Sequence, residues 1–184
     1  MKEKEKMISG EIYNPADAEL YHERIIAKTL CQKYNNLIPY DVDNKKTVLK
    51  KLLGQFCDHC CIEPNFFCDY GYNIEVGENF YANHNLVILD CAKVKFGDNV
   101  FIGPNCGIYT ACHPTNSEDR IKGIEFAKPV TIGNNVWIGG NTCILPGVTI
   151  GENTVIGAGS VVTKDIPSNV IAVGNPCKPI KKTD

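Results

Sequence analysis

Hydrophobic residues recur every six positions along the second half of the chain. The aliphatic residues that keep this interval without exception are Ile132, Ile138, Ile144, Ile150, Ile156 and Val162. Residues upstream that keep it are Phe96, Ile102 and Ile108, with Val76, Ala82 and Ile88 following it less regularly. A six-residue period fits neither an amphipathic helix nor a simple hairpin. It is typical of a parallel β-helix, in which each hexad supplies one short strand and a corner.

Glycine and asparagine lie between these aliphatic residues. Glycine follows directly in four of the six regular hexads, at positions 133, 139, 151 and 157. The asparagines near the hexad boundaries are Asn79, Asn99, Asn134, Asn135 and Asn153. Both residue types tolerate tight corners and left-handed backbone conformations. The pattern predicts an all-β-dominated domain over residues 57–184, with three hexads closing each coil.

The six-residue interval stops over residues 110–129, TACHPTNSEDRIKGIEFAKP. Ile108 and Ile132 are 24 residues apart, which is four hexads, so the register resumes unchanged. A solenoid tolerates an insertion at a corner because each coil contacts only its neighbours. Long loops in compact folds are often functional. We therefore expect residues 110–129 to form an extruded loop, with His113 near its base.

Residues 1–56 follow a helical pattern instead. Asn14 suits an N-cap, Pro15 a first helical position and Asp17 a first turn. The apolar residues that then recur at helical spacing are Leu20, Ala27, Leu30 and Tyr34. A second helix is predicted over residues 43–53, with Gly54 just beyond its end. We expect an N-terminal helical segment that covers the larger body of residues 57–184.

The composition argues against nucleic-acid-binding, membrane-spanning and secreted proteins. The 184 residues carry a formal net charge of −2 at pH 7 and a pI of about 6.1, which gives no general attraction to nucleic acid or anionic membranes. No apolar run has the length of a membrane-spanning helix. The charged N-terminus is not followed by an apolar segment of signal-peptide length. A cytoplasmic location is expected.

The chain contains ten cysteines. In a chain without a secretion signal we expect reduced thiols, most of them small apolar core residues. The cluster Cys57-Asp58-His59-Cys60-Cys61, with Cys68 further on, has metal-ligand spacing. A zinc site needs four ligands in tetrahedral reach. No metal is expected there, and a bound metal stays the alternative.

Beyond the bare hexads, six segments resemble the hexapeptide-repeat acetyltransferases of the maltose and galactoside type. They are EKEKMISGEIYNPADAEL (3–20), FCDYGYNIEVGENFYANHN (67–85), HP (113–114), KPVTIGNNVWIGG (128–140), GAGSVVTKDIP (157–167) and GNPCKPIKK (174–182). The resemblance covers nearly the whole chain. It implies a left-handed coil, acetyl-CoA as co-substrate, a sugar acceptor, and a homotrimer with active sites between adjacent subunits.

Acetyl transfer to a hydroxyl needs a base near that hydroxyl, a hydrogen-bond donor for the carbonyl oxygen, and fixed substrates. His113 holds the position of the family's catalytic histidine, and an imidazole is a good proton acceptor near neutral pH. Without the resemblance, a surface or core histidine would be the simpler interpretation. His84 is expected to line a pocket or pack, and Trp137, inside a hexad, to pack.

The acceptor side is assigned through the same resemblance. Asn83 matches a residue that contacts the reacting groups, and Asp69 matches a polar residue of the acceptor site. Glu125 could orient His113, bind a sugar hydroxyl or lie in solvent. Asp17 could bind sugar, but capping a helix explains it equally well. The galactoside type has two acids near Asp90-Cys91, whereas this chain keeps only the first, which favours the maltose type.

The donor side follows the later coils. Gly140 matches the position whose N–H faces the thioester carbonyl, and Ala158 lines the slot for the pantetheine arm. The residues matched to coenzyme amide groups and phosphates are Thr163, Lys164, Lys178 and Lys181. Lysine binds phosphate as a point charge. Without the resemblance, KPIKK at the C-terminus is equally typical of a solvated tail.

These assignments favour direct transfer from acetyl-CoA to maltose or glucose, because no serine or cysteine is placed as an acylated nucleophile. Other acceptors, such as a galactoside, a lipid-linked oligosaccharide or a non-sugar alcohol, are the alternative. A zinc-dependent enzyme on the same scaffold, like one class of carbonic anhydrase, and a non-catalytic solenoid are weaker alternatives. Nucleic acid and membrane partners are not expected.

Overall fold

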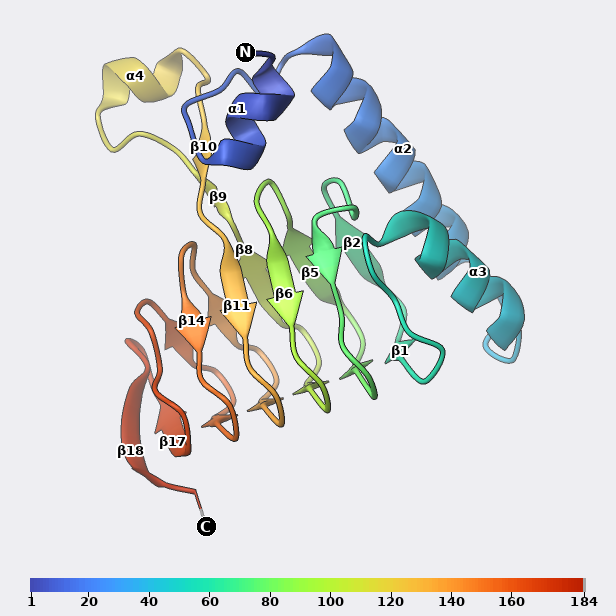
Figure 1. The fold of residues 1–184 in the computed structure, drawn as a ribbon, viewed down its shortest axis with the longest axis vertical. Coiled ribbons are helices and arrows are strands. Elements are labelled where there is room, and N and C mark those ends of the chain that lie inside the picture. Colours follow the sequence, from blue (N-terminus) through green and yellow to red (C-terminus); the bar gives the residue numbers. More distant parts are fainter. Residues whose placement is uncertain (184) are drawn as a thin grey trace.

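The computed structural model describes residues 1–183, in which helices at one end cover a stack of short, coiled strands (Figure 1). The helices are α1 (Glu3–Ser9), α2 (Ala18–Asn35), α3 (Val42–Leu52) and α4 (Ser117–Ile121). The strands pair in parallel from coil to coil, which confirms the predicted parallel β-helix of hexapeptide repeats with a helical N-terminal segment.

Three parallel sheets form the walls of the prism. The first wall contains β1 (Cys61–Ile62), β4 (Tyr81–Ala82), β7 (Phe101–Ile102), β12 (Trp137–Ile138), β15 (Val155–Ile156), β17 (Val170–Val173) and the antiparallel β18 (Lys178–Lys182). The second wall contains β2 (Phe66–Cys68), β5 (Leu86–Leu89), β8 (Gly107–Tyr109), β13 (Cys143–Ile144) and β16 (Val161–Val162). The third wall contains β3 (Ile74–Glu75), β6 (Val94–Phe96), β11 (Val130–Ile132) and β14 (Thr149–Ile150).

The hexad residues fill the interior of the prism as predicted. Ile138, for example, pairs with Ile102 on one side and Ile156 on the other, and all three are buried. Asparagines at the corners adopt positive φ, as at Asn99 (56°) and Asn135 (57°). The Asn99 side-chain amide donates to the Asn135 side-chain oxygen at 2.9 Å. Asparagine therefore supplies both the left-handed corner and a bond between coils.

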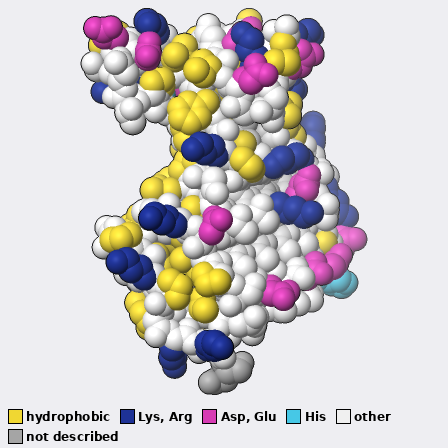
Figure 2. All heavy atoms as spheres, turned by 60° about the vertical axis from the view of Figure 1, so that its left-hand side comes forward, with side chains coloured by type: hydrophobic (Ala, Val, Ile, Leu, Met, Phe, Trp, Pro, Cys, Tyr) yellow, Lys and Arg dark blue, Asp and Glu magenta, His cyan; other side chains and the backbone are white. Residues whose placement is uncertain are grey.

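The three walls differ in their outer faces. On the first wall the outward residues are Tyr81, Phe101, Trp137, Val155 and Ile171, and on the second they are Phe67, Val87, Leu89, Tyr109, Cys143 and Val161. On the third they are Glu75, Lys95, Thr131 and Thr149. Two walls are thus apolar outside and one is polar. Figure 2 shows hydrophobic side chains gathered in patches, and a hollow below the upper lobe.

One of these residues corrects the sequence analysis. Trp137 was expected to pack, but its side chain is 58% exposed on the first wall. The reason is the alternation of a strand: Trp137 precedes the inward-facing Ile138 and so points to the opposite side.

The N-terminal helices begin differently from the prediction. α2 starts at Ala18, because the carboxylate of Asp17 accepts hydrogen bonds from the N–H groups of Glu19 (3.0 Å) and Leu20 (3.3 Å). Asn14 and Pro15 lie in the turn before it, so the expected cap at Asn14 was wrong. Leu20, Ala27 and Tyr34 are buried as predicted. A further helix, α1, precedes this turn.

The extruded segment, residues 110–129, is an ordered arm. β9 (Ala111–Cys112) and β10 (Phe126–Ala127) pair antiparallel and carry α4 at the tip. The backbone groups of Tyr13 and Glu125 exchange hydrogen bonds of 2.9 and 3.0 Å. The N-terminal segment is therefore bonded to the arm, which fixes the position of the arm over the coils.

The cysteines agree with the prediction in part. Cys57 and Cys60 form a disulfide, so these two are not the free thiols that were expected. Of the remaining eight, five are buried: Cys31, Cys68, Cys91, Cys106 and Cys177. Within residues 1–183, no group of three or more potential ligands is placed to hold a metal ion. No helix of the same described range is long and apolar enough to span a bilayer.

Candidate active site

A cavity of about 480 Å³ lies where the arm, the N-terminal segment and the second wall meet. Its lining residues are Pro15, Ala16, Tyr21, Arg24, Asp69, Tyr70, Leu89, Cys91, Ala111, His113 and Glu125. This volume falls in the range of small-molecule sites, and a few converging polar groups on an apolar lining are typical of them. The cavity is therefore the candidate site for a small polar substrate.

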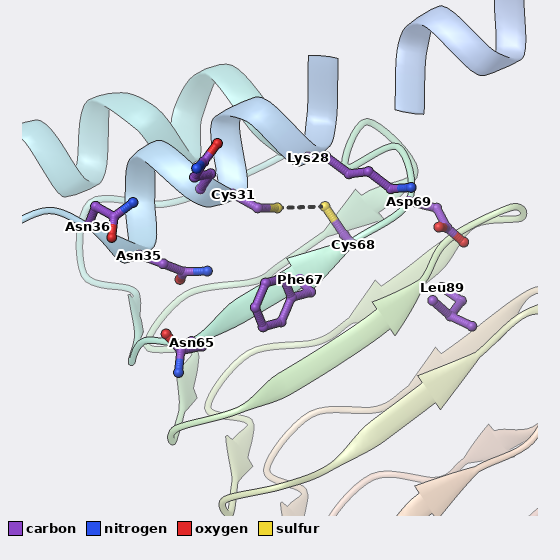
Figure 3. A pocket seen from close by; sticks show the side chains of 10 residues that line it. Lys28, Cys31, Asn35, Asn36, Asn65, Phe67, Cys68, Asp69 and Leu89 are labelled. Atoms are coloured by element: carbon purple, nitrogen blue, oxygen red, sulfur yellow. Dashed lines mark hydrogen bonds between the residues drawn. The ribbon is translucent and has the colours of Figure 1, made fainter. Parts of the chain in front are cut away.

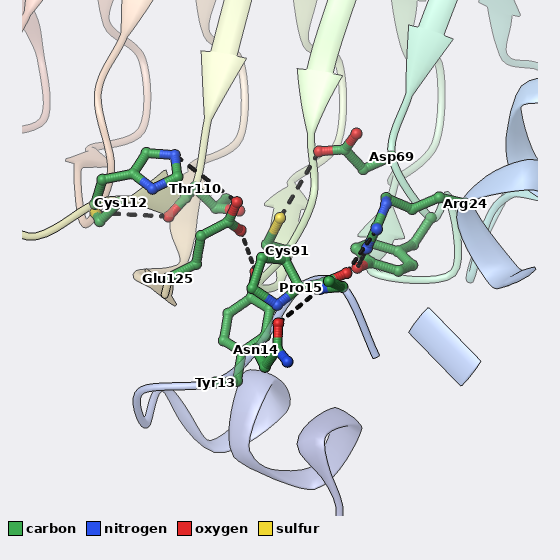
Figure 4. A network of polar contacts seen from close by, with 12 residues as sticks. Tyr13, Asn14, Pro15, Arg24, Asp69, Cys91, Thr110, Cys112 and Glu125 are labelled. Atoms are coloured by element: carbon green, nitrogen blue, oxygen red, sulfur yellow. Dashed lines mark hydrogen bonds and ion pairs between the residues drawn. The ribbon is translucent and has the colours of Figure 1, made fainter. Parts of the chain in front are cut away.

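His113 and Glu125 face each other across the base of the arm. The imidazole Nε2 lies 3.7 Å from Glu125 Oε1, too far for a direct hydrogen bond but close enough for attraction when the imidazole is protonated. Glu125 Oε2 accepts a 2.6 Å hydrogen bond from the Tyr13 hydroxyl (Figure 4). The Glu125 side chain is 18% exposed and that of His113 is 51% exposed. Glu125 thus lies beside the histidine, with Tyr13 fixing its carboxylate.

Asp69 and Cys91 line the cavity opposite the arm, and the buried Asp90 lies behind them. Burial raises the pKa of the Asp69 carboxyl, and the Cys91 thiol donates to its Oδ2 at 3.7 Å. Burial also raises the pKa of the Asp90 carboxyl to about 7. Asp90 Oδ1 accepts hydrogen bonds from the N–H groups of Asp69 (3.0 Å) and Tyr70 (2.9 Å). Asp90 therefore lies behind the cavity and positions the backbone that carries Asp69.

Arg24 is a cavity residue that the sequence did not indicate. Its guanidinium donates to the Tyr70 hydroxyl (2.7 Å) and to the Pro15 carbonyl (2.6 Å). These bonds connect α2, the turn before it and the corner after β2. Arg24 gives the cavity a positive charge next to Asp69, whose pKa it lowers against the larger effect of burial.

The predicted acceptor residues are not all in this cavity. His113, Glu125 and Asp69 are brought together, while Asp17 caps α2 beside them. Asn83 lines a different cavity of about 430 Å³ on the first wall, with Tyr81, Phe101 and Trp137 among its lining residues. The Asn83 side-chain oxygen accepts from the His84 N–H at 2.7 Å. His84 contacts the Pro64 carbonyl and is exposed.

Two of the predicted donor-side residues, Gly140 and Ala158, lie along one corner, which we call the first corner. It joins the first wall to the second. Gly140 and Ala158 lie on it in successive coils, and Asn83 lies on it two coils before Gly140. A side chain at Gly140 would come within 3.1 Å of Pro104. Across residues 1–183, the Gly140 N–H has no hydrogen-bond acceptor. A small residue and a free N–H are what a thioester carbonyl needs to approach closely.

Two lysines extend this corner. Lys178 and Lys181 lie in β18, an exposed strand that pairs antiparallel with β17. Lys178 pairs with Val173 and Lys181 with Ile171, while a bulge shifts the register between these pairs. Paired residues share a face of a sheet. The bulge therefore puts both ammonium groups on the outer face, although residues three apart in a regular strand face opposite ways.

Thr163 and Lys164 lie elsewhere, at the end of β16, on the corner that joins the second wall to the third. This second corner also carries Asp69 and the root of the arm. The second wall separates the two corners. The chain from Gly139 to Leu145 has six residue-to-residue steps, which span at most about 20 Å when extended. The candidate base and the candidate donor N–H thus lie on different corners of one protomer.

Comparisons with known proteins agree with this architecture. Residues 6–56 match the maltose acetyltransferase hexapeptide capping motif, residues 93–112 the hexapeptide repeat of succinyl-transferase, and residues 129–164 the bacterial transferase hexapeptide with its six repeats. A putative acetyltransferase of Saccharomyces cerevisiae is 58% identical over 179 residues, which cover 97% of this chain and 91% of that protein.

Two solved structures share the whole fold. A maltose O-acetyltransferase from Clostridium difficile superposes with a TM-score of 0.99 at 52% identity, covering 100% of this chain and 98% of that one. A galactoside acetyltransferase in complex with coenzyme A gives a TM-score of 0.96 at 42% identity, covering 100% of this chain and 92% of that one. The likeness of sequence and fold along the full length means that the chain belongs to the hexapeptide-repeat acetyltransferases of the maltose and galactoside type.

Proposed function

We propose that this enzyme transfers an acetyl group from acetyl-CoA to a hydroxyl of a sugar, with His113 as the general base. The observation that carries the proposal is the cavity in which His113 and Glu125 face Arg24 and Asp69. Its polar groups suit the hydroxyls of a sugar, because they include both hydrogen-bond donors and acceptors. The similarity to a galactoside acetyltransferase in complex with coenzyme A supports the donor.

The reaction follows from these groups. A sugar hydroxyl bound in the cavity gives its proton to the imidazole of His113 while its oxygen attacks the thioester carbonyl carbon. The charge that develops on the carbonyl oxygen is stabilised by the Gly140 N–H. The C–S bond then breaks, and the imidazolium returns the proton to the leaving thiolate. Glu125 stabilises the imidazolium between these steps, because its carboxylate lies 3.7 Å from Nε2.

A second copy of the chain completes the site in this proposal. The His113 cavity and Gly140 lie on different corners, so one protomer does not bring them to the same acetyl group. The apolar outer faces of the first and second walls are the surfaces that a ring of copies would bury. In the proposed assembly the first corner of one copy, which carries Asn83 and Gly140, lies beside His113 of the next copy. We propose a homotrimer on this basis.

Maltose or glucose is the proposed acceptor. Cys91 stands where the galactoside type has a second acid, and its thiol donates to Asp69. The cavity therefore keeps one carboxylate at this wall for hydroxyl binding, and burial raises the pKa of that carboxyl. A galactoside or a lipid-linked oligosaccharide stays the alternative acceptor.

An acceptor screen tests the proposal. Release of free thiol from acetyl-CoA is followed with glucose, maltose, a galactoside and an amino acid, for the wild type and for His113→Ala. We expect thiol release with glucose or maltose that the variant loses. Equal rates in the two proteins, or release with the amino acid alone, would contradict the assignment.

A further inference from the structure

A second groove continues from the active-site cavity. It has a volume of about 550 Å³ and lies between α2 and β2. Asp69 and Leu89 line both this groove and the cavity that holds His113, so the two spaces share one wall. Figure 3 shows Lys28, Asp69 and Leu89 at one end of the groove, Asn36 and Asn65 at the other, and the Phe67 ring between them.

The groove combines an aromatic floor with a polar rim. The Phe67 side chain is 50% exposed, on the outer face of β2. Within residues 1–183, the side chains of Lys28, Gln32 and Asn36 make no hydrogen bond or ion pair. Asn35 differs, because its amide already bonds to the Phe66 N–H (2.8 Å) and carbonyl (3.0 Å). Three polar groups of the rim are thus free to bind a ligand.

The free groups lie on one side of α2. Tyr21 lines the active-site cavity, and Lys28 and Gln32 follow it by seven and eleven residues, which is close to two and three turns. With a rise of about 1.5 Å per residue, the span from Tyr21 to Gln32 is about 16 Å. The groove and the cavity of His113 together are therefore longer than a single sugar ring.

We propose that this groove binds the non-reacting units of an oligosaccharide acceptor. The inference rests on the proposed function, since it assumes a sugar in the cavity. A sugar ring has an apolar C–H face that packs on an aromatic ring, and hydroxyls that both donate and accept hydrogen bonds. Phe67 provides the ring, and the amides of Gln32 and Asn36 both donate and accept.

A second copy of the chain is the competing occupant, because the proposed trimer buries the outer face of the second wall. Phe67 lies on β2, the last strand of that wall, beside α2, so we place it outside the buried part of the wall. The rim also argues against a second copy. Lysine is depleted in the cores of protein interfaces, whereas Lys28 lines the groove at the end that meets the cavity of His113 (Figure 3). The direct continuity with the cavity of His113 also favours a ligand that enters both spaces.

The test measures selectivity for acceptor length in the full-length protein. Thiol release from acetyl-CoA gives kcat/KM for glucose, maltose and maltotriose in the wild type, Phe67→Ala, Gln32→Ala and Tyr40→Ala. Tyr40 is the matched aromatic control, because it is 81% exposed and lies outside both spaces. We expect the wild-type kcat/KM to rise with length. Phe67→Ala should lower the ratio of maltotriose to glucose about tenfold, the size of a lost aromatic contact, and Gln32→Ala a few-fold, with Tyr40→Ala unchanged.

Other outcomes overturn the inference in recognisable ways. If glucose is acetylated and length has no effect in any variant, the groove is not a sugar subsite while the proposed function stands. If no sugar is acetylated and maltotriose does not bind in calorimetry, the proposed function and the proposed sugar groove are both wrong. If Phe67→Ala instead changes the oligomeric state in sedimentation without changing the ratio, a second copy fills the groove.

Discussion

Replacing Asp90 by Asn should remove a dependence of stability on pH that the wild type shows. Asp90 is fully buried, and its Oδ2 has no hydrogen-bond partner within residues 1–183. Burial raises the pKa of this carboxyl from 3.8 to about 7. Between these two values the folded protein keeps a proton that the unfolded chain has already released. The stability from Asp90 is therefore fully present below pH 3.8, falls as the pH rises, and levels off above pH 7.

The gap between the two pKa values sets the size of the effect. A difference of roughly three pH units corresponds to about 4 kcal/mol in the free energy of unfolding. Asn keeps the oxygen that accepts from the N–H groups of Asp69 and Tyr70, and it has no charge to bury. Its NH₂ group replaces the unpaired oxygen at a cost of about 1–3 kcal/mol, which is the same at every pH.

Urea unfolding followed by circular dichroism measures this difference at pH 4.5, 6 and 8, with the protein concentration held fixed because assembly also changes stability. From pH 4.5 to pH 8, Asp90→Asn should gain at least about 2 kcal/mol on the wild type, half of the full linkage value. Asp90→Ala is the control for the hydrogen bonds. It loses the charge, as Asp90→Asn does, and it also loses the oxygen that accepts from the N–H groups of Asp69 and Tyr70. If the difference between wild type and Asp90→Asn is constant over this range, Asp90 is ionised in the folded protein throughout and the reasoning is refuted.

Three further predictions concern catalysis. His113→Ala should lower kcat by about 100-fold or more, the scale of a general base, and leave acetyl-CoA binding intact in calorimetry; near-normal turnover would exclude it as the base. Glu125→Gln removes the attraction between the carboxylate and the protonated His113 imidazole, which is about 1–2 kcal/mol at 3.7 Å in a largely aqueous dielectric. We therefore expect kcat to fall about 5- to 30-fold. An unchanged kcat would mean that the carboxylate does not act on the imidazolium. Lys178→Ala should weaken acetyl-CoA binding at low salt and less at high salt, while Lys95→Ala, on the third wall, should not; equal affinities would take Lys178 out of the donor site.

The body of the fold was predictable from the sequence because a six-residue period leaves few alternatives. Each aliphatic residue, such as Ile138 or Ile156, marks an inward position independently of the rest of the chain. The same pattern accounts for the outward position of Trp137, because side chains alternate along a strand and Trp137 directly precedes the inward-facing Ile138. The order within the arm was not predictable, since it depends on Tyr13 bonding to Glu125, 112 residues away.

Among the residues that line the active-site cavity, the sequence indicated only those that belong to a recognisable motif or to the loop beside it. His113 was found because HP is part of the resemblance, and Glu125 because it lies in the same loop. Arg24 lies on a helix face that also carries ordinary solvent-exposed residues, and its role depends on Tyr70, 46 residues away. The buried state of Asp90 likewise depends on which coil covers it. Such contacts between distant segments leave no periodic signal in the sequence.

The stacking of coils makes the protein a molecular ruler. Neighbouring coils are about 4.8 Å apart, so Gly140 and the end of β17, where Lys178 pairs, are separated by two coils and about 10 Å. That interval is set by an integer number of hexads and not by any side chain. Inserting one complete coil of eighteen residues between them would keep the pairing between neighbouring coils. It would nevertheless move Lys178 away from Gly140 by one further coil, about 4.8 Å.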